Sequence, residues 1–477
     1  MLIFAKGYIE EISKLTDKNI YLAGSSIRDY FIKKEITNLH IVTLEDTRNI
    51  IKKFKDMGKV SLISFTEGNQ MSQVIFKSDN REKPDIYIHK IEGKNIYEYL
   101  SKKDFTINAL AVKIQNGKID FNNVIDPYGG LEDIKNKIIR EINENIFDKD
   151  PMGMLRVVRL MAQLNFDISD KIYELINRNN YRIKEIPGEK LRDELFRILG
   201  FKRAYYYFGF MDKHLGILSK IFPEIEPMKE VGKCKYHVVD AWTHSLHTMR
   251  VIEKIIYADG YFEKHLKKAY EEHAGQIMAK GHTRIQLIKL AALFHDIGKP
   301  RARWVDETGR VRFRGHEIVG GEIMADISDR LGLSKKEKKF LCKIVREHMW
   351  PLTLYKTNDV SGRALYDLFK NFGEITLDII LIGLADIIST RQLLKPHEEM
   401  GMYKVHAEYL ANNYLTRFKR LEDISGVINE DDILKNFHIE DKQIINHILD
   451  SVKRAIFFGE IPLERGRILS YIEDRLL

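Results

Sequence analysis

The sequence predicts an α+β protein, in which a small mixed α/β domain at the N-terminus is followed by a mostly helical region. Two observations predict this class. Short runs rich in β-branched and aromatic residues alternate with helical stretches in residues 1–125. From about residue 145 onward, apolar residues recur at helical spacing, as in Met154, Leu155 and Val158, and strand-like alternation almost disappears. The predicted strands are residues 19–23, 39–43, 73–76, 85–89 and 109–114.

The length and composition predict several folded domains. The chain has 477 residues, whereas one domain usually has roughly 100–200. Hydrophobic residues make up 44% and charged residues 31%, which is typical of globular proteins. No segment approaches the roughly 20 consecutive apolar residues of a membrane span, and the first six residues do not begin a secretory signal. We therefore expect a cytoplasmic protein with no membrane partner, and these features leave its oligomeric state unknown.

The chain carries a modest excess of positive charge. Lysine and arginine number 77 against 69 aspartates and glutamates, which gives a net charge of +8. Such a charge favours a polyanionic partner such as RNA, although a solvated, lysine-rich surface explains it equally well.

Changes of pattern along the chain predict four domains. Pro223, Pro227 and Gly232 interrupt the helical pattern just before a histidine-rich segment. The tail carries no motif that indicates a chemical role, and we expect it to be a packing or RNA-facing module. The predicted domains are the α/β domain at residues 1–125, a helical connection at 126–230, a histidine-rich helical domain at 231–400 and a helical tail at 401–477.

A histidine–aspartate pair follows an apolar helical run. His295 and Asp296 come directly after residues 290–294, and Gly298 and Pro300 then end the predicted helix, so the pair lies where a substrate could reach it. A lone pair of this kind is more often a packed core histidine. Here, however, a histidine lies upstream and an aspartate downstream, and ligands from several helices can converge on one interior point. Imidazole and carboxylate groups together suit Mn²⁺, Ni²⁺, Fe²⁺ or Zn²⁺.

This order of residues resembles the HD phosphohydrolase superfamily over about 150 residues. The resemblance implies a bound divalent metal (Mn, Ni, Fe, Zn or Mg) that activates water to hydrolyse a phosphate ester. The implied ligands of the first metal are His244, His295, Asp296 and Asp386, with His316 and His348 available to a second metal or to a phosphate. His295, Asp296 and Lys299 are the implied catalytic residues.

Arginines near the pair are candidates for contacts with phosphate or RNA. The candidates are Arg301, Arg303 and Arg314. A guanidinium group matches phosphate oxygens in pairs, although any single arginine of this kind is more often a solvated surface charge.

The N-terminal domain carries a second set of motifs. Residues 20–31 read as a strand, a tight turn at Gly24 and Ser25, and a helix with Arg28 and Asp29. Backbone amides at such a turn can bind a triphosphate, although an ordinary strand-to-helix turn has the same pattern. Three further segments follow downstream: residues 102–110 with Asp104 and Asn108, residues 126–135, and residues 150–159 with Arg156 and Arg159.

Together these segments resemble the head and neck of the class II tRNA nucleotidyltransferase and poly(A) polymerase family, the CCA-adding enzymes. Several bacterial members of that family also carry a C-terminal HD domain. The resemblance covers about residues 19–400. It implies a nucleotidyltransferase-like head, a helical neck, an HD domain and a tail, and it implies tRNA or another RNA 3′ end as the partner.

The sequence departs from the family at its metal-binding pair. The family has an Asp-x-Asp pair that holds two Mg²⁺ ions, and Asn38 and His40 stand in its place. A neutral amide and an imidazole suit Mg²⁺ poorly. Asp85 could be a surviving third carboxylate, and Glu45 and Asp46 are candidate substitutes. We therefore expect nucleotide addition to be lost, with Mg²⁺ and a nucleoside triphosphate bound only if the head is active.

The leading hypothesis is therefore a nucleotidyltransferase-like protein whose HD domain hydrolyses a phosphate ester of an RNA end or a nucleotide, such as a 2′,3′-cyclic phosphate. One alternative is an active tRNA nucleotidyltransferase that adds C or A. Another is a non-catalytic RNA-binding protein in which the HD metal has only a structural role.

Overall fold

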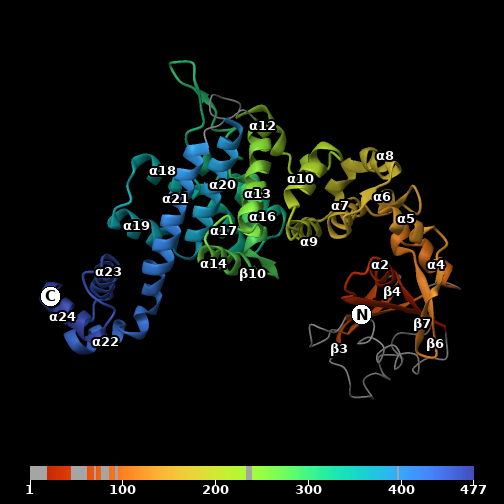
Figure 1. Ribbon diagram of the computed structural model, residues 1–477, viewed down its shortest axis with the longest axis horizontal. Helices are drawn as coiled ribbons and strands as arrows, with labels where there is room; N and C mark the ends of the chain where they lie inside the picture. The colour runs from red at the N-terminus through yellow and green to blue at the C-terminus, as the bar shows by residue number, and fades with distance from the viewer. Residues whose placement is uncertain are drawn as a thin grey trace. The chain divides into compact units, whose positions relative to one another are not determined.

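The computed structural model describes two compact units. The first unit comprises residues 1–186 with 213–220, and the second comprises residues 187–212 with 221–477. The four predicted domains divide the chain more finely than these units, so their boundaries stay predictions. The predicted α+β class is confirmed, because the large sheet belongs to the first unit and helices dominate the second (Figure 1). The described residues are 19–44, 62–68, 71–76, 85–91, 95–232, 239–394 and 397–476.

The sheet of the first unit is mixed. In the described residues its strand order is β3-β4-β5-β2-β1-β6-β7, with β2 and β5 parallel and the other neighbours antiparallel. The register sets Asn38 opposite Asp85 and His40 opposite Tyr87. The strands are β1 Ile20–Ala23, β2 Asn38–Thr43, β3 Leu62–Gly68, β4 Met71–Phe76, β5 Asp85–Lys90, β6 Ala111–Gln115 and β7 Lys118–Ile125.

Five of these strands match the five predicted runs, whereas β3 and β7 were not predicted. β7 joins β6 through a two-residue turn, in which Asn116 and Gly117 have φ angles of 50° and 72°. Positive φ at both central positions is typical of a type I′ turn, for which Asn-Gly is the preferred sequence. The dipeptide therefore carries a signal that could have predicted this hairpin.

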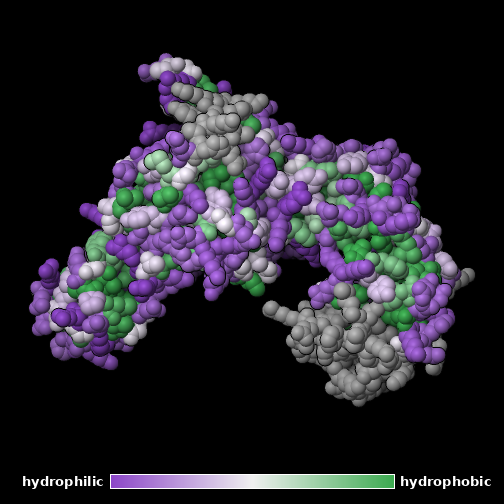
Figure 2. All heavy atoms as spheres, in the orientation of Figure 1, coloured by the Kyte–Doolittle hydropathy of each residue, from purple (hydrophilic) through white to green (hydrophobic). Residues whose placement is uncertain are grey.

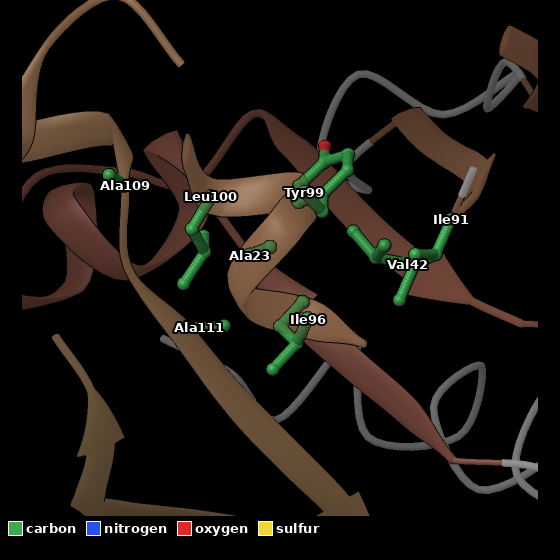
Figure 3. Close-up of a cluster of buried hydrophobic side chains, with 8 residues drawn as sticks. All are labelled: Ala23, Val42, Ile91, Ile96, Tyr99, Leu100, Ala109 and Ala111. Carbon is green, nitrogen blue, oxygen red and sulfur yellow. The ribbon is translucent and has the colours of Figure 1, made fainter. Parts of the chain in front are cut away.

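A cluster of buried side chains packs helix α4 (Ile96–Ser101) against the sheet (Figure 3). Ile96, Tyr99 and Leu100 contribute from the helix, and Ala23 and Val42 contribute from strands β1 and β2. The side chain of Asn95 caps the helix by accepting a hydrogen bond from the Glu98 amide. This packing sets the end of α4, and the two lysines that follow it, beside β2.

Helices complete the first unit. α7 is amphipathic and buries Leu155, Val158 and Met161, as the helical spacing predicted. The remaining elements of this part are α2 Ser25–Phe31, η1 Thr106–Asn108, α5 Gly130–Asn136, α6 Ile146–Lys149, α7 Gly153–Leu164, α8 Asp170–Asn179 and η2 Asn180–Glu185, with a small sheet formed by β8 Ile138–Ile139 and β9 Asp167–Ile168.

The second unit is built around α15 (Arg284–Phe294), all of whose residues except Gln286 are buried. A capping box between Thr283 and Gln286 fixes its first turn. The helices before α15 are α9 Gly188–Leu199, α10 Ala204–Lys213, α12 Ile225–Glu230, α13 Ala241–Tyr257 and α14 Lys264–Ala274, and the helices after it are α16 His316–Arg330, α17 Lys335–Glu347, α18 Trp350–Thr357, α19 Gly362–Phe372 and α20 Thr376–Leu394. Two short hairpins accompany them: β10 Ile277–Ala279 with β11 His282–Thr283, and β12 Trp304–Val305 with β13 Val311–Arg312. All but the last residue of α11 Leu218–Ile221 belongs to the first unit.

The tail of this unit is also helical. Its last three helices share a hydrophobic core of their own, which includes Ile433, Ile448 and Ile468. The helices are α21 His397–Asn413, α22 Glu430–Phe437, α23 Lys442–Phe458 and α24 Arg465–Arg475. Hydrophilic residues cover most of the visible surface in Figure 2. In the described part of the chain, no helix combines the length and apolar character that crossing a membrane requires.

Candidate functional site

The predicted HD ligands come from five separate places in the second unit, and the fold brings them together. His244 lies on α13, Asp386 on α20, and His316 begins α16. His295 and Asp296 follow the last residue of α15, and His348 follows the last residue of α17. All the histidines of this group and Asp296 are buried. The two residues at the end of α15 are therefore within reach of ligands from four other helices.

Gly298 allows the turn after α15 to lie close to the start of α16. A Cβ atom at this position would lie 2.0 Å from the backbone oxygen of His316. The turn after α15 can therefore contact the start of α16 only if residue 298 has no side chain, which brings His316 close to Asp296. The sequence predicted Gly298 only as a helix stop.

The distances between the ligand atoms fit a metal centre. His244 Nε2 lies 2.9 Å from Asp386 Oδ1 and 3.6 Å from Asp296 Oδ2, and His316 Nε2 lies 3.3 Å from Asp296 Oδ1. Neighbouring ligands at about 2.1 Å from an octahedral ion are separated by about 3 Å. His244, His295 and Asp386 form one group of potential ligands, and His295, Asp296 and His348 form another.

Three histidines present an unsatisfied nitrogen to this centre. The Nδ1 atoms of His295, His316 and His348 each donate to the backbone carbonyl three residues earlier, at 2.8, 2.8 and 2.7 Å. A carbonyl only accepts, so Nδ1 carries the proton. Each Nε2 is buried and has no hydrogen-bond partner. Orientation of an imidazole by its second nitrogen is typical of metal ligands, and this donor set fits a divalent ion.

Charges around the centre keep the two carboxylates ionised. Burial opposes ionisation of Asp296, but Lys299 and His295 hold its pKa well below the usual value. Burial likewise opposes ionisation of Asp386, and the hydrogen bond with His244 keeps its pKa low. Burial lowers the pKa of His295, but Asp296 and Asp386 together raise it above its ordinary value.

A pocket of about 640 Å³ opens onto this centre. Lys299 lines it and contacts Asp296 Oδ2 through Nζ at 2.5 Å. Arg314 lines it as well, whereas Arg301 and Arg303 are exposed and do not contribute to its wall. Phe313 and Lys356 were not singled out from the sequence, although both line the pocket. Lys356 lies on α18, far along the chain from Lys299, so only the tertiary structure brings the two lysines together.

The first unit contains a second pocket, of about 500 Å³, beside β2. Gly24 joins β1 to α2 with a φ of 72°, a backbone conformation that favours glycine. The predicted head residues in the pocket wall are Gly24, Ser25, Arg28, Asp29, Asn38, His40, Asp104, Asn108, Arg156 and Arg159. The side chain of Asp85 and residues Glu45 and Asp46 lie outside the described part of the chain.

The acidic residues in the wall of this pocket are paired with arginines. Arg28 is buried, donates to Asp29 Oδ1 at 2.7 and 2.9 Å, and donates to Asn108 Oδ1 at 2.6 Å. Arg156 Nη2 lies 2.7 Å from Asp104 Oδ2. These pairs hold the pocket wall together.

His40 contacts a second histidine, which the sequence did not single out. His40 Nδ1 lies 3.2 Å from His89 Nε2 on the neighbouring strand β5. Burial and Lys103 lower the pKa of His40 to about 4, and burial and His40 lower that of His89 to about 3. The pair is therefore neutral near pH 7. Alternation along β5 is the signal that could have identified His89, because residues 85, 87 and 89 share one face of the strand.

Family comparisons match three segments of the chain. Residues 20–140 match the poly(A) polymerase head domain, residues 165–229 match the probable RNA- and SrmB-binding site of polymerase A, and residues 241–391 match the HD domain. The predicted head, RNA-binding and HD regions are thus all found, in the predicted order.

Similar proteins include three nucleotide-adding enzymes. The chain is 25% identical to the CC-adding tRNA nucleotidyltransferase of Thermus thermophilus over 82% of this chain and 81% of that protein. It is 25% identical to the A-adding tRNA nucleotidyltransferase of Deinococcus radiodurans over 61% of this chain. The matched part of this chain spans 60% of the length of that relative. It is 30% identical to the CCA-adding enzyme of Lactobacillus johnsonii over 37% of this chain and 45% of that protein.

Solved structures of CCA-adding enzymes share the fold. One, in complex with CTP, has a TM-score of 0.64 and 18% identity over 99% of this chain and 94% of that chain. The Thermotoga maritima CCA-adding enzyme in complex with tRNA has a TM-score of 0.60 and 16% identity over 98% of this chain and 94% of that chain. At this identity the likeness concerns the fold alone. With the three matched domains, it follows that the chain belongs to the tRNA nucleotidyltransferase and poly(A) polymerase family, in the form that carries an HD domain.

Proposed function

We propose that the protein acts on the 3′ end of tRNA and that its head adds nucleotides there. The observation that carries this proposal is that similar proteins include A-adding, CC-adding and CCA-adding enzymes. The comparisons therefore favour the alternative of an active head over the loss of addition that the sequence predicted. The matched RNA-binding segment supports RNA as the partner.

The head pocket supplies groups for binding and orienting a nucleotide. Arg28, Lys102, Lys103 and Arg159 place positive charge in its wall, which suits a triphosphate. Asn38 and His40 do not offer the charge with which a carboxylate pair binds Mg²⁺, so we assign no metal-dependent step to them. We expect addition to be slower than in an enzyme that carries two carboxylates at these positions.

Incorporation of labelled CTP and ATP into tRNA that lacks its CCA end tests this proposal. The full chain should extend the tRNA with Mg²⁺ or Mn²⁺, and Arg28→Ala should reduce extension because Asn108 and Asp29 then lose their partner. Exposed Asn122→Ala on β7 is a matched control in the same unit. Binding of tRNA without incorporation, under every metal tried, would overturn the proposal and leave the head as an RNA-binding platform.

A second candidate activity is hydrolysis of a phosphate ester by the HD centre. The three buried Nε2 atoms without hydrogen-bond partners favour it, because they form an oriented set of metal-binding nitrogens, and His316 among them lines a pocket that also contains Lys299 and Arg314. A divalent metal, when bound, would lower the pKa of a water ligand and stabilise negative charge on phosphoryl oxygens. Lys299 and Arg314 are positioned to hold the phosphate in the pocket.

Hydrolysis of 2′,3′-cyclic nucleotides and nucleoside 2′-phosphates with Mn²⁺, Ni²⁺ and Mg²⁺ tests the HD centre. His295→Ala should abolish hydrolysis and leave nucleotide addition unchanged, whereas the exposed His265→Ala should affect neither activity. Hydrolysis that persists without His295, or that is absent with every metal, would remove this candidate.

A further inference from the structure

Helix α17 carries a concentration of positive charge that the metal centre does not explain. The helix contains five lysines and one arginine against two glutamates. Its apolar face buries Phe340, Leu341 and Ile344, so most of the lysines lie on the face that is turned away from the core. None of them lines the HD pocket. The charge therefore belongs to a separate surface of the second unit.

The acid in the first turn of α17 does not neutralise these lysines. The side chain of Glu337 is buried, and its Oε2 accepts hydrogen bonds from the Ser334 amide and hydroxyl at 2.8 and 2.6 Å. Its Oε1 lies 2.6 Å from His282 Nδ1 on β11. The carboxylate thus caps the helix and holds the β10–β11 hairpin against it, and its charge is turned inward.

Three lysines of α17 are exposed and have no acidic neighbour. Lys338 pairs with Asp329 at 2.6 Å, whereas no described acidic residue forms an ion pair with Lys335, Lys336 or Lys339. Lys335 and Lys336 are the first two residues of the helix, where the free backbone amides already carry partial positive charge. Positive side chains at these positions are unfavourable for the helix. Helix stability therefore does not account for them.

The loop before α17 joins this charged face to two other segments. The backbone oxygen of Gly332 accepts hydrogen bonds from Arg192 Nη1 on α9 at 2.7 Å and from Lys280 Nζ in the β10–β11 turn at 3.2 Å. A Cβ atom at Gly188, the first residue of α9, would lie 1.7 Å from the backbone oxygen of Arg330. The start of α17, the β10–β11 turn and α9 therefore lie together in the second unit (Figure 1).

One of these neighbours belongs to a matched RNA-binding segment. α9 lies within residues 165–229, which match the probable RNA- and SrmB-binding site of polymerase A. Lys190 is exposed on α9, and Lys280 is exposed in the β10–β11 turn. The lysines of α17 thus continue a charged surface from the matched segment onto the HD domain. Lysine binds phosphate as a point charge, without the geometry that reads a base.

We propose that the exposed face of α17 binds the phosphate backbone of RNA. This α17 surface consists of Lys335, Lys336 and Lys339, with Lys190 and Lys280 beside them. The HD domain would then hold the RNA through a surface that is distinct from its metal centre. The inference rests on RNA as the partner and on neither of the two activities proposed above.

The test measures the affinity of the full chain for tRNA that lacks its CCA end. Lys335→Glu with Lys339→Glu reverses two charges that are four residues apart and thus share one side of the helix. The double variant should raise Kd about 10- to 100-fold, as measured by fluorescence anisotropy of labelled tRNA without nucleoside triphosphate. The slope of log K against log salt should become smaller by about two, because two phosphate contacts are lost. Lys335→Arg with Lys339→Arg should keep the wild-type affinity.

The matched control is Lys264→Glu with Lys268→Glu. Lys264 is the exposed first residue of α14 in the same unit, and Lys268 lies four residues further along that helix. This pair changes the net charge by the same amount, but on a face of mixed charge, where Lys268 lies 3.8 Å from Glu272. It should leave Kd nearly unchanged. Thermal unfolding should show no loss of stability in the α17 variant, because an acid in the first turn favours the helix.

Three outcomes would overturn the inference. Wild-type affinity and salt slope in the α17 variant would show that this surface does not contact RNA. Equal losses in the α17 and α14 variants would show that net charge alone is responsible. If tRNA binding is unchanged while the α17 variant loses binding to phosphatidylserine vesicles, the surface belongs to a membrane contact. Because binding is measured without catalysis, failure of nucleotide addition or of hydrolysis leaves this result intact.

Discussion

In the HD centre, His295, His316 and His348 each engage one ring nitrogen with a backbone carbonyl and leave the other buried and unpartnered. Beside the head pocket, His40 and His89 instead contact each other, and Nδ1 of His89 is a single buried nitrogen without a hydrogen-bond partner. The acids in the head wall are likewise paired with arginines. This difference between the two sites shows that a group of charged and polar residues does not by itself indicate a metal site. Several oriented nitrogens that meet at one point without hydrogen-bond partners are the stronger signal, because burying each of them unsatisfied costs free energy.

The largest expected effect is the loss of metal affinity when an HD ligand is removed. His295 belongs to both groups of potential ligands, so His295→Ala should lower affinity for Mn²⁺ or Ni²⁺ more than about 100-fold. Elemental analysis of dialysed protein and calorimetric titration measure this loss. His265→Ala should retain the wild-type metal content. Full metal content in His295→Ala would show that the buried Nε2 atoms without hydrogen-bond partners do not bind the metal.

The next largest expected effect is a faster rate of nucleotide addition when carboxylates are introduced at positions 38 and 40 of the head. The double variant Asn38→Asp, His40→Asp returns the charge that gathers Mg²⁺, so CMP and AMP incorporation should rise between about ten- and a hundredfold. Asn122→Asp with Asn123→Asp adds the same charge at exposed positions of β7 and should leave the rate unchanged. An unchanged rate in the first variant would mean that the head obtains its metal ligands elsewhere.

Sequence patterns predicted most of the fold because local propensity and burial agree there. The five predicted strands are rich in β-branched and aromatic residues, and the ligands of the HD centre follow a recognisable order. The pairing of His40 with His89 could not be predicted, because it depends on which strands become neighbours. Arg301 and Arg303 are near the HD pair in sequence, but the hairpin that follows leaves them exposed and away from the pocket wall.

The head pair should also make the stability of the first unit depend on pH. Burial, Lys103 and Arg28 lower the pKa of His40 from an ordinary 6.5 to about 4, and burial, His40 and Lys103 lower the pKa of His89 to about 3. Between these values and 6.5 the unfolded chain binds more protons, so the free energy of unfolding falls as pH falls. We expect a loss of about 1–2 kcal/mol per histidine between pH 7 and pH 5.

Hydrogen exchange of the β2 and β5 segments measures this loss. His40→Gln with His89→Gln removes both titrating groups and should flatten the pH profile of these strands. The tail helices of the second unit, which are remote in sequence from the pair, provide an internal reference. A profile that is equally steep in the double variant would assign the pH dependence to other groups.

The smallest expected effect concerns a residue that orients a ligand without contacting the metal. Ser389 Oγ lies 3.2 Å from His244 Nδ1 and 2.8 Å from the backbone oxygen of Asp386. The hydroxyl donates to that carbonyl, so it accepts from Nδ1 and leaves Nε2 to face the two carboxylates. Ser389→Ala should lower metal affinity by about tenfold, as measured by calorimetric titration, because His244 then loses the bond that selects this tautomer. Ser389→Thr keeps the hydroxyl and should recover part of the affinity. Wild-type affinity in Ser389→Ala would mean that the ring is held by packing alone, and the contrast with the head would then rest on the three carbonyl-oriented histidines.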